Sequence, residues 1–448
     1  MSEFPPNLPV VDPTVSTDSD PATNAGEGTR AVHGPAAPAP AQTPMGLPTY
    51  RSTAFVFGSS QDYADVLGDT TPGYSYSRID NPTADAFALA HAALEAHGLE
   101  RPVAAQPFAS GMAAISTVLL TLCSAGGHVV APAAVYGGTF GVLQAVLARF
   151  GVTTSFVDMT DHDAVQTALR PETSLVWAET IANPTTAVTD IPAIAAIAHA
   201  ADVPLCVDST FAPPVICRPL EWGADIVVHS ATKYVGGHSD VTGGIAVGDV
   251  DLLSRVRLTR INLGGSLAPD EAFLLHRGLA TLPLRVARQC ASALTLASSL
   301  VDHPAVERID YPGLATHPQH AVAERLFDKG PEGRRYGGIV TVTPKGGRAA
   351  GMRVADALRV GVVATSLGGT HTVVSHVAST THRQLDDAAL LAAGILPGAL
   401  RISVGLEDAE DLVHDVRRAL DSGADALDGG VDVIGGAADG DDMSPIRH

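Results

Sequence analysis

The sequence predicts an α/β protein with a large domain built on a mainly parallel sheet and a smaller C-terminal α+β domain. Its 448 residues are too many for one compact core. Hydrophobic residues make up 46% and charged residues only 17%, which is enough apolar material for two or more cores. Between residues 83 and 250, helical stretches alternate with short strands that are apolar throughout, and such strands are typical of a parallel sheet covered on both faces.

The elements of the large domain follow this alternation along the chain. Apolar periodicity predicts helices at 83–97, 111–122, 138–149, 161–169 and 191–201. Continuous apolar runs predict strands at 128–131, 152–157, 174–178, 204–207 and 225–228. Ligands of such sheets bind beyond the carboxyl ends of the strands, so the residues that follow each strand are the candidates for a site.

The rest of the chain predicts the domain boundaries. Residues 251–280 are expected to form a long helical connector, and the strands that follow are expected near 336–343, 361–366 and 399–404, with a helix from 408 to 420. We expect a disordered extension over 1–45, because Pro, Ala, Thr and Asp dominate there without apolar periodicity. The remaining parts are expected to be an extended arm at 46–82, the large domain at 83–277, the smaller domain at 278–425 and an acidic tail at 426–448.

Charge and cysteine content exclude several classes of protein. With 48 acidic against 28 basic residues the net charge is −20, which repels phosphate backbones and anionic lipid, so neither nucleic acid nor a membrane is an expected partner. The four cysteines are far apart and form no CxxC pair, so we expect neither a disulfide framework nor a metal site. The N-terminus lacks the basic start and apolar run of a signal peptide, and we therefore expect a cytoplasmic protein.

Lysine is rare in this chain, which draws attention to Lys233. Only Lys233, Lys329 and Lys345 occur, and the last two precede glycine in polar segments. Lys233 instead closely follows the predicted strand 225–228, in Val227-Val-His-Ser-Ala-Thr-Lys-Tyr. An amine at that position is suited to act as a nucleophile or a proton carrier once its pKa is lowered, which arginine cannot do. An ordinary surface lysine is the alternative.

Asp208 ends another predicted strand, 25 positions before Lys233. This pair suits a pyridine cofactor whose ring nitrogen is kept protonated by an aspartate and whose aldehyde is bound by a lysine. A helix cap or a metal ligand would also explain Asp208. The segment Phe108–Ala114 opens a helix with small residues, and its free N–H groups, with hydroxyls from Ser230 and Thr232, are candidates for a phosphate site. A plain helix cap explains that segment equally.

Eight short motifs occur in order along the chain: Tyr76–Thr83, Ser110–Met112, Tyr136–Thr139, Glu179–Pro184, Val207–Phe211, His229–His238, Ser366–Gly369 and Arg401–Glu407. In sequence and spacing they resemble the Cys/Met-metabolism family of enzymes that depend on pyridoxal 5′-phosphate (PLP). This trans-sulfuration group includes cystathionine γ-lyase, cystathionine γ-synthase and methionine γ-lyase. The resemblance covers residues 46–422 and implies the PLP-dependent transferase fold of type I, with PLP as the cofactor.

The resemblance implies roles for the cofactor-binding residues. Lys233 matches the lysine that binds the cofactor aldehyde, Asp208 the partner of the ring nitrogen, and Tyr136 a ring that stacks on the cofactor and takes part in proton transfer. Asn183 matches a residue near the phenolic oxygen. The phosphate would be held by a further set, namely Gly111, Met112, Ser230 and Thr232.

It also implies how substrate and subunits meet. Arg401, with Ser366 nearby, matches a clamp on the α-carboxylate of an amino-acid substrate. Tyr76 and Arg78 match residues that complete the phosphate site of the adjacent subunit, which implies a homo-oligomer, a dimer of dimers (homotetramer). Relatives that handle cystathionine have a glutamate for the distal amino group where this chain has His371, so His371 is a candidate for substrate choice.

The activity that the resemblance implies is that of a carbon–sulfur lyase. It would act by γ-elimination on a sulfur amino acid, namely cystathionine, methionine or homocysteine. A γ-replacement enzyme, such as a cystathionine γ-synthase or an O-acyl-homoserine sulfhydrylase, is the alternative. From a different class, a non-catalytic oligomer that binds the cofactor only structurally is a third possibility. Methionine γ-lyases carry cysteine where this chain has Gly138.

Overall fold

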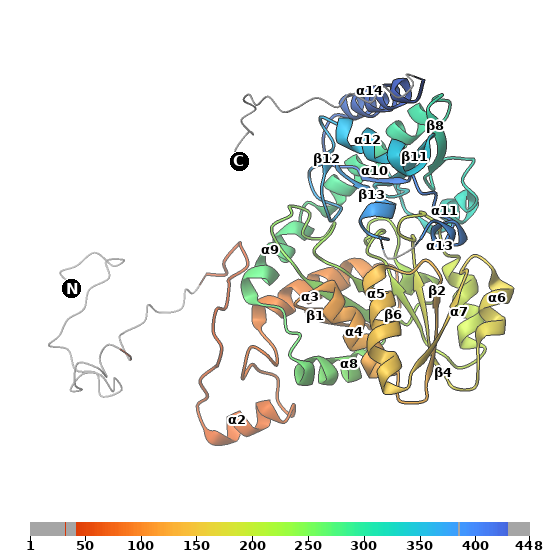
Figure 1. Cartoon of the computed structure of the whole chain (residues 1–448). Helices are drawn as coiled ribbons and strands as arrows, with labels where there is room; N and C mark the ends of the chain where they lie inside the picture. Colours follow the sequence, from red (N-terminus) through yellow and green to blue (C-terminus); the bar gives the residue numbers. More distant parts are fainter. Residues whose placement is uncertain (1–31, 33–41, 384–385, 429–448) are drawn as a thin grey trace, which may run out of the picture. The chain divides into compact units, whose positions relative to one another are not determined.

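A computed structural model describes residues 42–383 and 386–428, together with residue 32. The chain divides into a unit of residues 1–47 and a unit of residues 48–448. Most of the predicted N-terminal extension (1–45) and of the predicted acidic tail (426–448) lies outside the described residues. In the described residues the second unit contains a seven-stranded and a five-stranded sheet, both visible in Figure 1, and a two-stranded hairpin.

The first sheet has seven strands in the order β1-β7-β6-β5-β4-β2-β3. Their bounds are β1 Ala104–Phe108, β2 His128–Pro132, β3 Thr153–Val157, β4 Thr173–Glu179, β5 Leu205–Asp208, β6 Ile226–His229 and β7 Gly244–Gly248. All pairs from β3 to β6 are parallel, whereas β7 runs antiparallel to both β1 and β6. The predicted α/β class is confirmed, and the five predicted strands correspond to β2 to β6.

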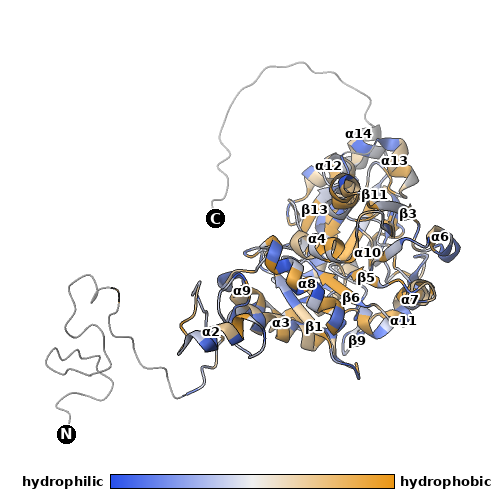
Figure 2. Ribbon diagram, turned by 90° about the horizontal axis from the view of Figure 1, so that it is seen from below, coloured by the Kyte–Doolittle hydropathy of each residue, from blue (hydrophilic) through white to orange (hydrophobic). Residues whose placement is uncertain are grey.

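Helices cover both faces of this sheet (Figure 1). They are α3 Pro82–Glu95, α4 Gly111–Leu122, α5 Gly137–Gly141 with a π turn and a 3₁₀ turn up to Phe150, α6 His162–Ala168 and α7 Ile191–His199. Alternate residues of β4 enter two separate cores, because Val176 packs in the cluster that contains α3 and α7 while Trp177 packs in the cluster that contains α4. Figure 2 shows the apolar strands β5 and β6 inside the molecule.

The predicted connector at 251–280 is two helices and not one. Helix α8 (Val250–Leu263) ends at Gly264, which has the left-handed φ of +78° that favours glycine. Helix α9 (Pro269–Leu279) then begins with a proline at its first position. The arm at 46–82 contains the short helix α2 (Ser60–Leu67). Arg257 of α8 forms ion pairs with Asp69 and Asp80, and these contacts attach the C-terminal part of the arm to α8.

The second sheet has five strands in the order β12-β13-β14-β11-β8. They are β8 Val306–Asp310, β11 Ile339–Pro344, β12 Val362–Val363, β13 Val373–His376 and β14 Leu400–Ser403. The helices of this part are α10 Leu282–Leu300, α11 His320–Leu326, α12 Gly347–Ala357, α13 Asp387–Ala392 and α14 Ala409–Asp428. The predicted strands at 336–343 and 399–404 correspond to β11 and β14, whereas only Val362 and Val363 of the predicted strand 361–366 pair in the sheet.

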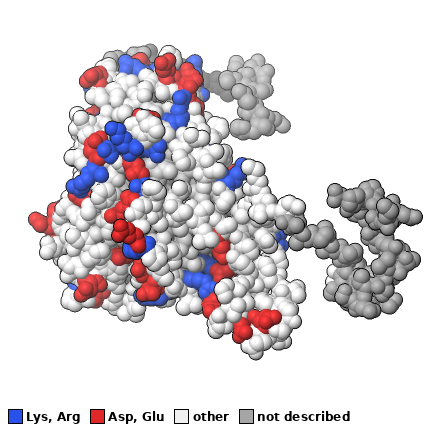
Figure 3. Space-filling model, turned by 180° about the vertical axis from the view of Figure 1, so that it is seen from behind, with Lys and Arg blue, Asp and Glu red and all other residues white. Residues whose placement is uncertain are grey.

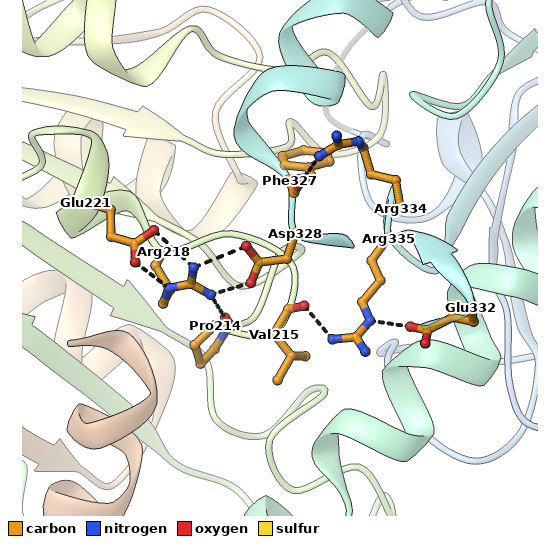
Figure 4. A network of polar contacts seen from close by, with 9 residues as sticks. All are labelled: Pro214, Val215, Arg218, Glu221, Phe327, Asp328, Glu332, Arg334 and Arg335. Atoms are coloured by element: carbon orange, nitrogen blue, oxygen red, sulfur yellow. Dashed lines mark hydrogen bonds and ion pairs between the residues drawn. The ribbon is translucent and has the colours of Figure 1, made fainter. Parts of the chain in front are cut away.

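An ion-pair network joins the segment after β5 to the β9–β10 hairpin (Lys329–Gly330 and Gly333–Arg334), as Figure 4 shows. Arg218 donates to Glu221 at 2.9 and 3.0 Å and also binds Asp328. Arg335 donates to the carbonyl oxygen of Val215 at 3.0 Å. The network therefore fixes the hairpin against the first sheet's domain.

Acidic and basic side chains are intermixed over the face of the molecule that Figure 3 shows. Among the residues that the structure describes, none of the helices combines the length and the apolar character needed to cross a bilayer.

Candidate active site

A cavity of about 820 Å³ opens at the carboxyl ends of β4, β5 and β6. Residues of the second sheet and its loops line the other side. Ten of the predicted site residues meet in this cavity: Gly111, Met112, Tyr136, Asn183, Asp208, Ser230, Thr232, Lys233, Ser366 and Arg401. The structure therefore brings these ten residues together beyond the ends of the strands.

Lys233 lies four residues beyond the end of β6, and its amine points into the cavity. Its Nζ donates a hydrogen bond of 2.8 Å to Oγ of Ser366. Burial, and then the guanidinium of Arg401, lower the pKa of Lys233 to about 8. A substantial fraction of the amine is therefore neutral near pH 7.5, the form that acts as nucleophile or base.

Asp208 is the last residue of β5 and is buried at the floor of the cavity. Its Oδ1 accepts hydrogen bonds from the backbone N–H and the hydroxyl of Thr210, at 3.0 and 2.6 Å. Burial raises the pKa of Asp208, because a charged carboxylate is unfavourable there without a cation. A protonated pyridine nitrogen is a cation of the required kind.

The N-terminus of α4 forms a cradle suited to a phosphate. Ser110 caps the helix by accepting from the N–H of Ala113, so the N–H groups of Gly111 and Met112 have no acceptor within the helix. A Cβ on Gly111 would come within 2.6 Å of the Ser230 side chain, so only glycine permits this close approach. These features fit a phosphate group.

Thr232, also predicted for the phosphate site, already has partners. Its hydroxyl accepts from the N–H of Gly243 at 3.0 Å and lies 3.2 Å from the carbonyl oxygen of the same residue. It therefore braces the loop that holds Lys233 in addition to lining the cavity.

Arg401 on β14 is a second cation that lines the cavity, and it is 4% exposed. It donates to Oδ1 of Asn183 at 3.2 Å and to the carbonyl oxygen of Ser366 at 3.0 Å. Its Nε has no partner among the described residues, which leaves an N–H available to a carboxylate. Ser366 thus contacts both Lys233 and Arg401, and it does so with a left-handed φ of +78° that is unusual for a residue with a side chain.

Glu179 is a cavity residue to which the sequence analysis assigned no role. It ends β4 as Asp208 ends β5, and its Oε1 accepts the backbone N–H of Tyr136 at 2.7 Å. Burial, and then the nearby Asp208, raise the pKa of Glu179 to about 8. The carboxyl group holds the turn on which Tyr136 stands, at the rim of the cavity. A charged residue at the end of an apolar strand was the signal that could have found it.

Three predicted residues do not line the cavity. His371 is exposed and lies beside Thr370, with its Nδ1 3.2 Å from the hydroxyl. Tyr76 is 41% exposed, and Arg78 stacks over its ring at 5.7 Å and donates to the carbonyl oxygen of Ile261. The structure therefore does not bring these side chains to the cavity of their own chain.

The sheet order and the cavity define the class: an α/β enzyme that brings a lysine, an aspartate and an arginine together in one cavity. The chain belongs to the family of Cys/Met metabolism PLP-dependent enzymes, whose family model matches residues 28–421. The predicted family, fold class and PLP dependence are thereby confirmed, as is the assignment to sulfur amino-acid metabolism.

The relatives and a solved structure cover most of the chain. An L-methionine γ-lyase of Treponema denticola is 38% identical, over 84% of this chain and 92% of its own. A cystathionine γ-synthase of Mycobacterium tuberculosis is also 38% identical, over 88% and 97%. A crystal structure of cystathionine γ-synthase from Xanthomonas oryzae pv. oryzae superposes with a TM-score of 0.78 at 35% identity, over 85% of this chain and 94% of that one.

Proposed function

We propose that this enzyme cleaves the Cγ–S bond of a sulfur amino acid by γ-elimination. The observation that supports this most is the contact of Ser366 with both Lys233 and Arg401 inside one cavity. It places an amine with a lowered pKa beside a guanidinium that can bind a carboxylate, which suits removal of the α-proton from a bound amino acid. Relatives named L-methionine γ-lyase support the elimination outcome.

Each of the cavity residues has its own role in this proposal. Arg401 would hold the α-carboxylate of the substrate. Lys233 would hold the cofactor aldehyde until the substrate amine displaces it, and the freed Nζ would then take the α-proton. PLP, when bound, supplies the electron sink for the pair that this proton leaves behind. Asp208 would keep the ring nitrogen protonated, and Tyr136, held by Glu179, would move a proton at the γ-position of the substrate.

The cradle at the N-terminus of α4 and the neighbouring loops are proposed to bind the cofactor. Gly111, Met112, Ser230 and Thr232 are proposed to hold the phosphate, and Asn183 to lie near the phenolic oxygen. Tyr76 and Arg78, which do not line the cavity of their own chain, are proposed to complete the phosphate site of an adjacent subunit in a dimer of dimers. We also propose that the enzyme works in the cytoplasm.

One observation favours γ-replacement as the second candidate. A Cβ at Gly138 would come within 2.6 Å of both the Tyr136 ring and the Met112 sulfur. The cysteine that methionine γ-lyases carry at this position therefore does not fit here unless one of those side chains moves. The M. tuberculosis relative, a cystathionine γ-synthase, is as similar as the lyases.

The experiment is a substrate panel with the purified holoenzyme. Methionine, cystathionine and homocysteine are offered alone, and an O-acyl-homoserine is offered with and without a thiol. Release of 2-oxobutyrate and ammonia from a sulfur amino acid supports γ-elimination. Thiol-dependent formation of a thioether, with little 2-oxobutyrate, would show the replacement enzyme instead. The Lys233→Ala variant is the control, because any turnover that remains in it does not come from the proposed site.

A further inference from the structure

A buried cluster of titratable side chains lies behind the cavity and has no role in the proposed mechanism. It consists of His91 and Glu95 on α3 and His229, the last residue of β6. All three side chains are at most 1% exposed, and their ligand atoms lie within 4.8 Å of one another. Buried groups of this kind are costly, so their presence calls for an explanation.

One strong contact organises the cluster. Oε1 of Glu95 lies 2.5 Å from Nε2 of His229. The ring of His91 meets that of His229 edge-on, at 4.9 Å between centroids. The second oxygen of Glu95 and both nitrogens of His91 have no hydrogen-bond partner among the described residues. The pair Glu95–His229 is therefore the polar core of the cluster.

Burial favours the uncharged form of each member of the pair. Burial raises the pKa of Glu95 to about 7 and lowers that of His229 to about 4. Burial also lowers the pKa of His91 to about 3, so its ring adds no charge. The other charged or titratable groups that act on the pair are Cys217, Arg218 and Glu221 on the side of α3, and Asp208 on the side of the cavity. One proton held between Glu95 and His229 satisfies both groups without a buried net charge.

The backbone connects this pair to Asp208. Asp208 of β5 lies opposite Val228 of β6, the residue immediately before His229. The N–H of Ser209 donates to the carbonyl oxygen of Val228 at 2.9 Å, so the ends of the two strands are fixed to each other. His229 therefore follows directly on the residue that is hydrogen-bonded to the Asp208–Ser209 segment.

We propose that Glu95 and His229 are positioning residues for Asp208. Glu95 holds the ring of His229 through their hydrogen bond, which fixes the end of β6 beside Asp208. The negative charge of Asp208 then remains available to the ring nitrogen of PLP. This inference rests on the proposed role of Asp208.

A metal ion is the competing explanation of two histidines and a glutamate. Two ligands of a tetrahedral zinc ion are separated by about 3.3 Å, given bonds of about 2.0–2.1 Å. Glu95 and His229 lie closer than that, at hydrogen-bond distance. The geometry therefore favours a shared proton, and metal content becomes an outcome of the test.

The test compares PLP affinity of the apoenzyme with its melting temperature. Glu95→Ala leaves the Nε2 of His229 without a partner, and we expect PLP to bind about tenfold more weakly. Glu95→Gln keeps a neutral hydrogen-bonding group of the same size, so affinity should return to within about twofold of wild type. His128→Gln is the matched control, because His128 is a buried histidine of the same sheet with two hydrogen bonds, to Thr173 and Ser155, away from Asp208. It should lower the melting temperature only.

Several results would overturn the inference. Glu95→Ala with unchanged PLP affinity and an intact fold is one, and a loss of affinity in His128→Gln equal to that in Glu95→Ala is another. One equivalent of a transition metal in the purified protein, lost in Glu95→Gln, would make the cluster a metal site. If Glu95→Ala does not fold, Glu95→Asp, which withdraws the carboxyl group from His229, is measured with the same expectation. Failure of the wild-type protein to bind PLP would instead refute the role of Asp208 itself.

Discussion

The amine of Lys233 should titrate about two pH units below an ordinary lysine in the cofactor-free protein. Its pKa of about 8 has two causes, burial and then the charge of Arg401. At pH 7.5 about a quarter of such an amine is neutral, against roughly 0.1% of a lysine with the usual pKa of about 10.4. Only the neutral amine reacts with acylating reagents. Lys233 should therefore be labelled far more readily at this pH than a lysine with the usual pKa.

Competition labelling of the apoenzyme with an anhydride, read by mass spectrometry, measures this titration. Each lysine is normalised to its own reactivity at high pH, so that access to the cavity cancels. Lys329 is the internal control, because it is exposed. Arg401→Met removes the second cause and should move the Lys233 profile upward, whereas Lys329 should not respond. A Lys233 profile that coincides with that of Lys329 would refute the reasoning about burial and charge.

Three further predictions concern binding, stability and assembly. Arg401→Lys should raise KM for the amino-acid substrate by about tenfold or more in steady-state kinetics, because lysine cannot supply the paired N–H groups and a hydrogen bond to a charged group is worth roughly 1.5–3 kcal/mol. Asp415 accepts the backbone N–H groups of Arg359, Val360 and Gly361, so Asp415→Ala should lower the free energy of unfolding by about 1–3 kcal/mol in a denaturant titration. Burial alone would raise the pKa of Asp415, but these hydrogen bonds and that of Arg418 lower it overall, so its contribution should be present above about pH 4 and be lost as the pH falls further. Mixed Arg78→Ala and Lys233→Ala subunits should regain part of the lost activity if sites are shared between subunits, and no recovery in well-mixed hybrids would count against sharing.

The sequence predicted the central strands well and the edge of the sheet poorly. Strands β2, β5 and β6 are apolar runs that are buried throughout, and β4 is buried over most of its length, whereas β3 at the other edge is only partly buried. By contrast, β1 includes Gln106 and Pro107, which break such a run, and β7 is five residues flanked by glycines. Both lie on the side of the sheet where β7 runs antiparallel, a pairing that no local pattern encodes. In the second sheet, β8 and β13 depend on partners far along the chain in the same way.

The site was predictable where a polar residue follows an apolar strand. Lys233 and Asp208 stand out for that reason, and the structure brings them into one cavity. The pair of Glu95 and His229 could not be predicted, because Glu95 reads as an ordinary charge on a helix until the fold packs it against β6. The same limit applies to Ser366, whose contacts with Lys233 and Arg401 depend on how the second sheet meets the first.

Substrate choice should depend on Thr365 and not on His371. Thr365 precedes Ser366 and lines the cavity, with its side chain exposed to it, whereas His371 is exposed beside Thr370 and does not line the cavity. A carboxylate at 365 would stand in the cavity next to the residue that contacts Lys233, where it can attract the distal ammonium group of cystathionine. A hydrogen bond between charged groups is worth roughly 1.5–3 kcal/mol, or about ten- to a hundredfold in affinity.

Thr365→Glu should therefore raise the ratio of kcat/KM for cystathionine to that for methionine by about tenfold or more. The matched variant His371→Glu introduces the same charge six positions later and should leave the ratio within about twofold of wild type, because an exposed charge is screened by solvent. Both ratios are measured in the same buffer, with PLP content and melting temperature recorded for each variant. A ratio that rises in His371→Glu and not in Thr365→Glu would contradict this prediction. It would mean that the 366–373 loop turns toward the cavity when substrate binds, so that residue 371 contacts the distal amino group as the family resemblance implies.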